Sequence, residues 1–588
     1  MRESCVDANR GGGLAEQIPA ADIHSLTERI TGPGMPYELV ETVIDGVRFR
    51  VFQNAPTNLR ELFACGLQYA DRDCYVFQEE RYSYRQAWEH AGRVANALRR
   101  EGVQPGDRVG IALRNYPEWI FAFMGITSIG AVAVAMNAWW SAEELRYGIE
   151  DSGLNWLFVD RERLERVSPF ARELSLQLVT VRCDTNGWRH WDAFLDAADP
   201  LMPDLPVSAD ANALILYTSG STSHPKGVLS SHRAIIHALL GWECAAAIAA
   251  ELFPALAAAD VVPAMLLSVP LFHVAGLNVQ LLSSFRQGRK LVGMYKWDPE
   301  AALRLIEQEK ITAFNGVPTM SWELIQSPNF SATDTSSLIS MGGGGSAMAP
   351  EHARQIDAKM PAGAAGTGYG MTETNGLGTT ISGAALLERP RSCGRPTPPL
   401  VQVKIVDEAG IELPRGETGE IWIRGPMNFR GYWNKPEATA STLTDGWVHT
   451  GDLGHMDLED YVFITDRAKD MVIRGGENIG CQEVEAAIYE HPAVSECAVF
   501  GLPDEHWGET LAAVVMRKPG ASLQAEEIKA HVASLLARFK VPERVWIQDE
   551  QLPRIASGKI YKRGLREAAI GRQKFRQGAH PLASSEDK

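Results

Sequence analysis

The sequence lacks the features that mark several common classes of protein. Its eight cysteines form no CxxC pair or cluster, so neither a zinc site nor a disulfide framework is predicted; they are Cys5, Cys65, Cys74, Cys183, Cys244, Cys393, Cys481 and Cys497. The first twenty residues are polar and glycine-rich and contain no apolar signal core. The most apolar region, from Ile235 to Leu277, is interrupted by acidic residues and prolines, which argues against a membrane span. These absences predict a soluble, cytoplasmic protein with reduced thiols.

Positive charge is scarce relative to negative charge. The chain has 57 basic and 73 acidic residues and a net charge of −16, which argues against bulk binding of nucleic acid or anionic lipid. An anionic substrate must therefore be held by local hydrogen-bond donors.

With 588 residues the chain is too long for one core, so at least two domains are expected.

Strands and helices alternate from about residue 83. Ser83 is the predicted N-cap of a helix that ends near Gly102 and carries an apolar stripe of Ala87, Ala91, Val94, Ala95 and Leu98. Further predictions are a helix at Pro117–Ile129 and strands at Val109–Leu113, Ala131–Met136, Trp156–Val159 and Leu214–Tyr217. Strands separated by helices of this length predict parallel β–α–β units and an α/β fold.

The pattern changes after about Val401. Short strand-like runs at Val403–Val406 and Glu420–Arg424 predict a distorted β subdomain. A smaller α+β pattern follows residues 466–470, with helices near Gln482–Glu490 and Ala525–Phe539 and strands near Val494–Phe500 and Leu511–Met516. The predicted divisions are a loose segment (1–30), a large N-terminal domain (31–466), a small C-terminal domain (467–570) and a tail (571–588).

Residues 217–227 read YTSGSTSHPKG and follow an apolar strand. Small residues let backbone N–H groups approach a polyphosphate, hydroxyls donate hydrogen bonds to it, and Lys226 neutralises charge. The stretch does not fit the Walker A pattern GxxxxGK[ST]. From the residues alone, a phosphate-binding loop and a polar surface loop both stay open.

The stretch resembles the signature loop of the adenylate-forming superfamily, which includes acyl-CoA synthetases, adenylation domains of nonribosomal peptide synthetases and firefly luciferases. Ser223 stands where that family usually has glycine. More stretches follow in the family's order: PLFHVAG (270–276), GVPTM (316–320), GGGGS (342–346), YGMTE (369–373), HTGD (449–452), DRAKD (466–470), GGENI (475–479) and PRIASGK (553–559). The resemblance covers about residues 60–570 and points to the branch of acyl-CoA synthetases and fatty-acid–CoA ligases.

The resemblance implies a role for each matching residue. Phosphate-binding residues would be Thr218, Ser219, Gly220, Ser221, Thr222, Lys226 and Thr372; adenine- and ribose-binding residues would be Gly343, Gly344, Gly345, Tyr369, Gly370, Asp452 and Arg467. Glu373 and Thr222 would hold Mg²⁺, which prefers oxygen ligands. Lys559, with Lys226, Thr372 and Glu373, would be catalytic. The acyl and thiol channel would be lined by His273, Gly316, Gly342, Gly368 and Gly376. Lys469 would be the hinge of a mobile C-terminal domain.

Each of these residues also has an ordinary structural interpretation. Lys559 could be a solvated lysine, Asp452 could cap a turn, and Gly343–Gly345 could be a flexible linker. His273 on an apolar segment is more often a core residue than a catalyst, so we expect it to line the channel and not to act as a base. The family context favours the functional interpretation of the others.

The expected activity is the joining of a carboxylic acid to coenzyme A. The acid would attack ATP to give an acyl-adenylate and pyrophosphate, and the CoA thiol would then displace AMP. No carrier-protein segment follows Lys559, which favours CoA over a peptide-synthetase module. A separate carrier protein as acceptor, a luciferase-like oxidation and a catalytically inactive nucleotide-binding scaffold are the alternatives.

The acid is expected to be apolar. Ala264, Met265, Phe314, Gly316, Gly342 and Gly376 suggest a roomy apolar pocket, and these segments contain no acidic residue for an α-ammonium group. Amino acids are therefore disfavoured, while fatty, aryl and cyclic or steroid-like acids stay open. ATP, Mg²⁺ and CoA are the expected ligands, no nucleic acid or integral membrane segment is expected, and a homodimer stays open.

Overall fold

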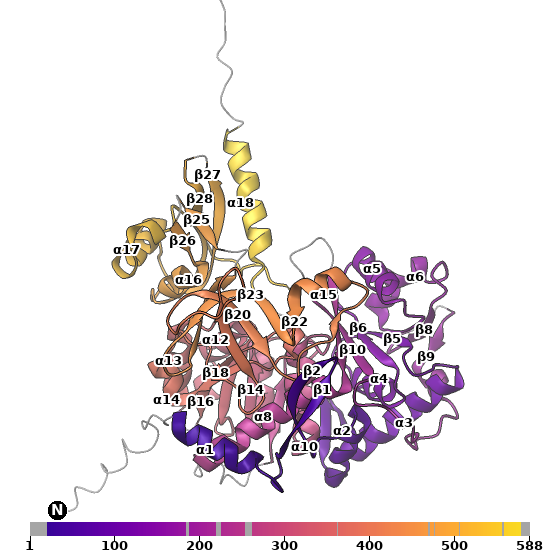
Figure 1. Cartoon of the computed structure of the whole chain (residues 1–588). Coiled ribbons are helices and arrows are strands. Elements are labelled where there is room, and N and C mark those ends of the chain that lie inside the picture. The colour runs from indigo at the N-terminus through magenta and orange to yellow at the C-terminus, as the bar shows by residue number, and fades with distance from the viewer. Residues whose placement is uncertain are drawn as a thin grey trace, which may run out of the picture.

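Two large sheets, on opposite sides of a layer of helices, form the centre of the part of the chain that the computed structural model describes (Figure 1). This part comprises residues 20–183, 187–218, 225–252, 262–360, 363–467, 471–474, 477–504, 506–555 and 558–577. The first sheet has the strand order β21 (Gly431–Tyr432), β11 (Lys226–Ser231), β10 (Asn212–Thr218), β6 (Val132–Ala135), β5 (Arg108–Ala112), β7 (Trp156–Val159), β8 (Gln177–Thr180), β9 (Arg189–His190). The second has the order β18 (Arg395–Pro396), β17 (Thr379–Ser382), β16 (Ala364–Tyr369), β15 (Ser340–Gly344), β14 (Ala313–Gly316), β12 (Ala264–Leu267), β13 (Lys290–Gly293), β3 (Asp73–Phe77), β4 (Glu80–Ser83).

The predicted β–α–β units are present. Strand β5 pairs in parallel with β6 and β7, and β14 pairs in parallel with β12 and β15. Helix α3 (Tyr84–Arg100) begins with a capping box, in which Ser83 accepts from the Gln86 backbone and the Gln86 side chain accepts from the Ser83 backbone. The α/β fold class is confirmed, and the boundaries of the elements differ from the predicted ones by a few residues.

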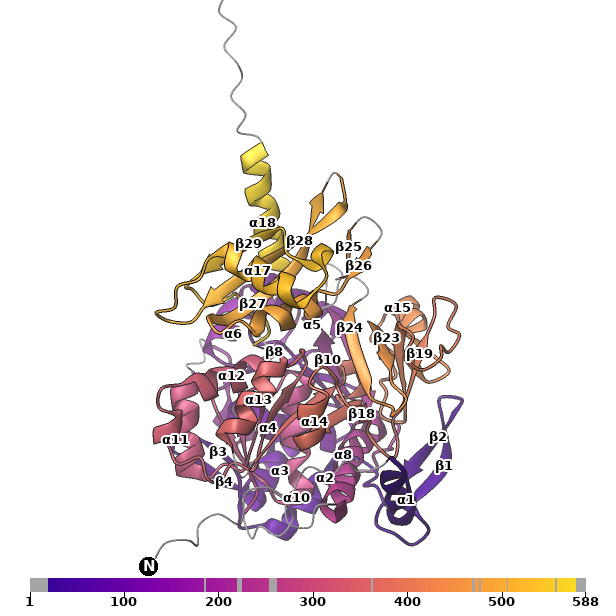
Figure 2. The same ribbon diagram turned by 90° about the vertical axis from the view of Figure 1, so that its left-hand side faces the viewer.

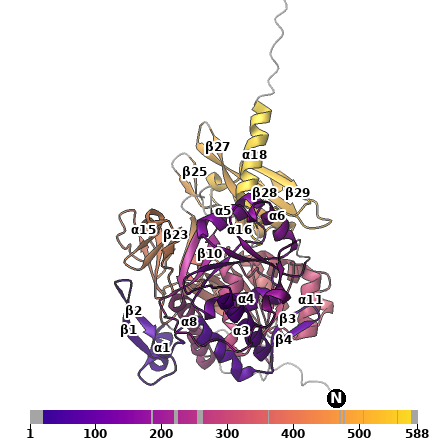
Figure 3. The same ribbon diagram turned by 90° about the vertical axis from the view of Figure 1, so that its right-hand side faces the viewer.

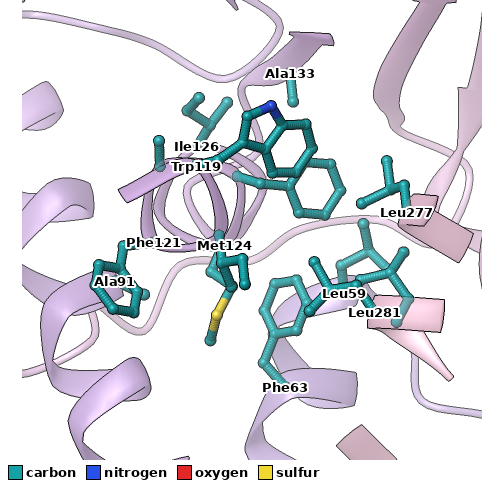
Figure 4. Packing of buried hydrophobic residues seen from close by; sticks show 14 of the residues in the cluster. Leu59, Phe63, Ala91, Trp119, Phe121, Met124, Ile126, Ala133, Leu277 and Leu281 are labelled. Carbon is teal, nitrogen blue, oxygen red and sulfur yellow. The ribbon is translucent and has the colours of Figure 1, made fainter. Parts of the chain in front are cut away.

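The main core lies between the two sheets around α4 (Pro117–Ser128), in which every residue except Glu118 is buried. Figure 4 shows Met124 of this helix on the side of Leu59 and Phe63 of α2 (Leu59–Cys65), whereas Phe121 lies beside Ala91 of α3. Burying each such large apolar side chain contributes roughly 1.5–3 kcal/mol, so this layer fixes the two sheets against each other. The core is continued by α7 (Trp191–Leu195), α8 (His232–Leu252), the π-helix η2 (Ala275–Leu282) and α10 (Ser284–Gln287).

The outer faces of the two sheets are also covered (Figures 2 and 3). On the first sheet lie α5 (Ala142–Ser152) and α6 (Arg161–Ala171). On the second lie α11 (Pro299–Glu309), α12 (Pro318–Gln326), α13 (Pro350–Lys359) and α14 (Gly383–Glu388). Both sheets are thus buried on both faces, as expected for mainly parallel strands.

The later chain forms a β subdomain and then a separate small sheet. The subdomain comprises β19 (Gln402–Val406), β20 (Gly419–Arg424), β22 (Leu443–Thr444), β23 (Trp447–Met456), β24 (Val462–Arg467) and the adjoining α15 (Pro436–Thr442). The C-terminal sheet comprises β25 (Val472–Arg474), β26 (Glu477–Ile479), β27 (Val494–Asp504), β28 (Gly508–Arg517) and β29 (Arg544–Gln548), with α16 (Cys481–Tyr489), α17 (Ala525–Leu535) and α18 (Lys562–Gln577) packed on it. Arg467 still belongs to β24, so the change of sheet falls after it. Lys469 lies outside the described residues.

Two predicted terminal segments are more ordered than expected. Helix α1 (Ala20–Thr31) lies within the segment predicted to be loose, because Ile23, Leu26 and Ile30 share one face and pack against the main core. A hairpin, β1 (Leu39–Ile44) and β2 (Val47–Phe52), follows it. Helix α18 continues to Gln577 and so extends into the predicted tail.

Helix α8 is the one helix of the described residues that is long and apolar enough to cross a membrane. Half of its most apolar 18-residue window is buried inside the protein, where its residues pack in the core between the sheets. This is the packing of a core helix.

Candidate active site

Lys559 comes from the C-terminal domain and reaches the end of strand β15 in the N-terminal domain. A Cβ atom added to Gly345 would lie 3.1 Å from the Lys559 Cε and 3.2 Å from its Nζ. Gly345 also has a φ of +82°, so a side chain there would be strained as well as crowded. Glycine at this position therefore leaves room for the lysine.

The surroundings of Lys559 disfavour its charge. Burial and the nearby Arg467 guanidinium lower the pKa of Lys559 to about 8, against a smaller opposite effect of Asp452. Burial and the nearby Lys559 charge lower the pKa of His273 to about 3. Its Nε2 has no hydrogen-bond partner among the described residues. A neutral imidazole suits the predicted channel residue, and that role stays a prediction.

Asp452 joins two of the other predicted nucleotide-binding residues. Its Oδ2 accepts a hydrogen bond from the Tyr369 hydroxyl (2.6 Å), and its Oδ1 lies 3.3 Å from Nε of Arg467. Asp452 and Arg467 are opposite each other on β23 and β24. Asp452 is only 6% exposed, and burial together with this carboxylate raises the pKa of Tyr369, which therefore stays a neutral donor. Asp452 is thus part of a network and not merely a turn cap.

Glu373 lies in the short helix η4 (Thr372–Thr374) and is 6% exposed. Burial raises its pKa, and its Oε1 accepts a hydrogen bond of 2.7 Å from the hydroxyl of Tyr432. Lys226, at the start of β11, has its Nζ 4.8 Å from the centroid of the same Tyr432 ring. One tyrosine therefore contacts both the predicted metal ligand and the predicted phosphate-binding lysine.

Tyr432 was not among the residues predicted from the sequence. It lies on β21, which pairs with β11 so that Tyr432 is opposite Val228. The hydrogen bond from its hydroxyl to Glu373 joins residues that are 59 positions apart in the sequence. The stretch RGYW (430–433) carries no hydroxyl-rich or carboxylate pattern that would have indicated this contact.

The glycines of the predicted pocket are explained mainly by close backbone approach. A Cβ atom added to Gly342 would lie 2.2 Å from the carbonyl oxygen of Gly366. One added to Gly343 would lie 2.5 Å from the carbonyl oxygen of Gly316, and one added to Gly370 would lie 2.3 Å from that of Gly376. Because residues 340–344 form β15, the flexible-linker interpretation is wrong for Gly343 and Gly344.

The remaining predicted pocket residues are placed differently. Gly376 has a φ of +88° and faces Trp242, Val274 and Val279. Gly368 lies against the Thr379 backbone, and Gly344 lies against the Gly368 backbone. Gly316 lies against Phe314 and Met320. Ala264, Met265 and Phe314 are buried in the cores, where Phe314 stacks on Trp297 with 5.5 Å between ring centroids. These three contribute to packing, while the roles of the glycines in binding an acid stay predictions.

The loop that carries Lys559 is held on α12 by Arg554. The Nη2 atom of Arg554 bonds to Oε1 of Glu323 (2.7 Å) in the N-terminal domain and to Oε1 of Glu496 (2.5 Å) in the C-terminal domain. Its Nη1 donates to the Gly558 carbonyl at 2.7 Å. Nε2 of Gln551 also donates to Oε1 of Glu323, at 2.8 Å.

An aromatic contact completes the interface between the domains. His352 stacks on Trp322, with 4.2 Å between centroids, and meets the edge of Tyr489 from the C-terminal domain. This region and the Arg554 network were not predicted, because they depend on tertiary contacts.

Of the phosphate loop, Thr218 is opposite Lys226 on β10 and β11, whereas Ser219, Gly220, Ser221 and Thr222 lie outside the described residues.

Comparison with known proteins identifies the family to which this chain belongs. The profile of the AMP-binding enzyme family matches residues 63–433, and that of the AMP-binding enzyme C-terminal domain matches residues 483–559. The chain belongs to the AMP-binding enzyme family. It is 36% identical over 481 residues to a feruloyl-CoA synthase from Amycolatopsis sp, covering 82% of this chain and 92% of that protein.

A second relative in sequence and a solved structure are also similar to this chain. A long-chain-fatty-acid–CoA ligase from Bacillus subtilis is 32% identical, covering 85% of this chain and 92% of that protein. The crystal structure of the anthranilate CoA ligase AuaEII with anthranoyl-AMP has a TM-score of 0.80 and 25% identity, covering 88% of this chain and 98% of that one. The predicted superfamily, fold class and enzyme class, an AMP-forming acid–thiol ligase, are confirmed.

Proposed function

We propose that this member of the AMP-binding enzyme family activates a largely apolar carboxylic acid, an aryl acid first of all, and joins it to CoA. The observation that carries the proposal is Lys559, which reaches from the C-terminal domain to Gly345 beside Arg467 and Asp452. The aryl preference is supported by the similarity to a feruloyl-CoA synthase and to an anthranilate CoA ligase. A long-chain fatty acid is the second candidate, supported by the Bacillus subtilis relative.

In the first half-reaction an oxygen of the acid's carboxylate bonds to the α-phosphorus of ATP. The bond from that phosphorus to the oxygen bridging to the β-phosphate breaks, and pyrophosphate leaves. Negative charge moves from the carboxylate to the oxygens of the α-phosphate and to the leaving pyrophosphate, so fixed positive charges there lower the barrier. Lys559 supplies such a charge from the C-terminal domain and Lys226 from the N-terminal domain.

Glu373 fits a divalent cation, because it is a buried carboxylate near the predicted phosphate-binding Lys226 and burial raises its pKa, so that a bound cation would favour its charged form. Glu373 would hold Mg²⁺ with Thr222 and phosphate oxygens, and the ion would neutralise phosphate charge. Asp452 would accept hydrogen bonds from the ribose hydroxyls, next to Tyr369 and Arg467.

In the second half-reaction the sulfur of the CoA thiol attacks the acyl carbon and its proton is released to solvent, the acyl–phosphate anhydride bond breaks, and AMP leaves. We infer that the C-terminal domain then moves about Lys469 and withdraws Lys559, so that one site serves both steps. The contacts that would have to break include the polar ones of Arg554 and Gln551 with Glu323 and the aromatic one of Tyr489 with His352.

The test is pyrophosphate release by the full chain with a panel of aryl, fatty and cyclic acids, with and without CoA. We expect release with aryl acids, and acyl-CoA only when CoA is added. Transfer to a phosphopantetheinylated carrier protein but not to CoA would support the carrier-loading alternative. Absence of pyrophosphate release with every acid would reject the proposal and leave a nucleotide-binding scaffold.

A further inference from the structure

Tyr432 occupies a position between the two charged groups that the first half-reaction requires in the N-terminal domain. Its hydroxyl donates to Oε1 of Glu373 at 2.7 Å, and its ring centroid lies 4.8 Å from Nζ of Lys226. The hydroxyl and the ring face are separate chemical functions, since one donates a hydrogen bond and the other attracts a cation. The contacts can therefore be removed one at a time.

Tyr432 is itself held firmly. Its backbone N–H donates to the Thr439 hydroxyl at 2.8 Å, and its strand pairs with β11, the strand that begins with Lys226. Phe429, whose ring meets the Tyr432 ring at 5.0 Å, donates its backbone N–H to the Glu373 carbonyl at 2.8 Å. The segment 429–432 thus fixes both the backbone and the side chain of Glu373.

We propose that Tyr432 is the positioning residue of adenylation: its hydroxyl orients the Glu373 carboxylate toward the metal, and its ring face orients the Lys226 ammonium toward the phosphates. A carboxylate has about four lone-pair sites, so the hydrogen bond on Oε1 fixes the group and leaves other sites for a cation. Groups that orient a metal ligand in this way typically change metal affinity 10- to 100-fold when removed. This inference rests on the proposed function, because it assigns the roles of Glu373 and Lys226.

Two substitutions separate the two functions. Tyr432→Phe removes the hydroxyl and keeps the ring, whereas Tyr432→Leu removes both. Tyr37→Phe is the matched control, because Tyr37 is a half-buried tyrosine that donates to Oε1 of Glu243 at 3.2 Å, outside the candidate site. Thermal unfolding of all three variants checks that they are folded.

The first measurement is Mn²⁺ affinity in the presence of saturating ATP and without acid, by electron paramagnetic resonance of free Mn²⁺. We expect Tyr432→Phe to weaken Mn²⁺ binding at least tenfold and Tyr37→Phe to leave it unchanged. In a Glu373→Gln background, Tyr432→Phe should have no further effect, because its partner carboxylate is gone. Unchanged or tighter Mn²⁺ binding by Tyr432→Phe would overturn the proposal.

The second measurement is metal-free ATP binding by calorimetry in the presence of EDTA. Tyr432→Leu should weaken it roughly two- to fivefold through loss of the ring–ammonium contact, while Tyr432→Phe should bind as the wild type does. Equal weakening by both variants would remove the assigned role of the ring. Both binding measurements stand even if no acid is adenylated, so failure of the proposed function and failure of this inference are distinguishable.

Discussion

Glu373 and Lys226 are held entirely within the N-terminal domain, whereas Lys559 reaches the same site from across a domain boundary. The first pair is fixed by one tyrosine, a sheet pairing and backbone hydrogen bonds. Lys559 depends on a loop whose contacts with α12 centre on Glu323, with Gly558 packed close to Met320 and Val317.

The difference teaches which part of the site is permanent. On the proposed mechanism Glu373 and Lys226 would be needed as soon as ATP binds, and the sheet edge that carries Tyr432 would position them in advance. On the proposed mechanism Lys559 would be needed only while the adenylate forms, and breaking the interface contacts described above would let it leave. Substitutions can separate the part of the site within the N-terminal domain (Glu373 and Lys226) from the part that comes from the C-terminal domain (Lys559).

Lys559→Ala should lower the rate of adenylate formation roughly 10²- to 10³-fold, the usual effect of removing one preorganised charge-stabilising group. Thioester formation from supplied acyl-adenylate and CoA should be largely unchanged. The control is Lys529→Ala, because Lys529 is paired with Glu526 on α17, within the C-terminal domain. Equal losses in both half-reactions would mean that Lys559 does not act in adenylation alone.

Glu373→Gln should raise the Mg²⁺ concentration for half-maximal adenylation roughly 10- to 100-fold, because an amide oxygen is a weaker ligand than a carboxylate. The measurement is pyrophosphate release as a function of Mg²⁺ at fixed ATP. Thioester formation from supplied adenylate should not change. A normal Mg²⁺ dependence would remove Glu373 from the metal site.

Raising the pH should remove the charge of Lys559. The pKa of a lysine is ordinarily near 10.5, and burial lowers that of Lys559 to about 8, so the ammonium is present below pH 8 and is lost above it. We expect kcat/KM for adenylation to fall above about pH 8, approaching tenfold per pH unit, because this parameter reports the free enzyme. In Lys559→Arg the guanidinium stays charged, so a weaker activity without this decline is expected. The same decline in Lys559→Arg would assign it to another group.

Glu323→Gln should weaken adenylation about tenfold, because it removes the charge that pairs with Arg554 across the interface while Glu496 remains. The measurement is single-turnover pyrophosphate release beside thioester formation from supplied adenylate, which should be unaffected or faster. Arg517→Gln, which breaks an exposed ion pair with Asp549 inside the C-terminal domain, is the control. Parallel losses in both steps would show that Glu323 only stabilises the fold.

The comparison also explains what the sequence could predict. The N-cap at Ser83 and the helix at Pro117 depend on neighbouring residues, so local patterns predicted them. Lys559, Glu373 and Asp452 stand in stretches that resemble a known family. Tyr432 and Glu323 were missed, because each acts on a partner 59 and 231 residues away, respectively. The glycines of β15 were noticed, but their close approach to neighbouring backbones follows only from the sheet.

The most direct test is to lock the loop of Lys559 in place. Cysteines at Glu323 and Gln551, whose side chains are hydrogen-bonded at 2.8 Å, can be joined by a short bis-thiosulfonate reagent that a reducing agent removes, with the wild type treated in the same way. In the cross-linked enzyme, single-turnover pyrophosphate release should be at least as fast as in the same double-cysteine variant without cross-link, acyl-CoA formation should stop, and reduction should restore it. Acyl-CoA formation at the full rate while the cross-link is intact would contradict the account, because Lys559 would then never have to leave.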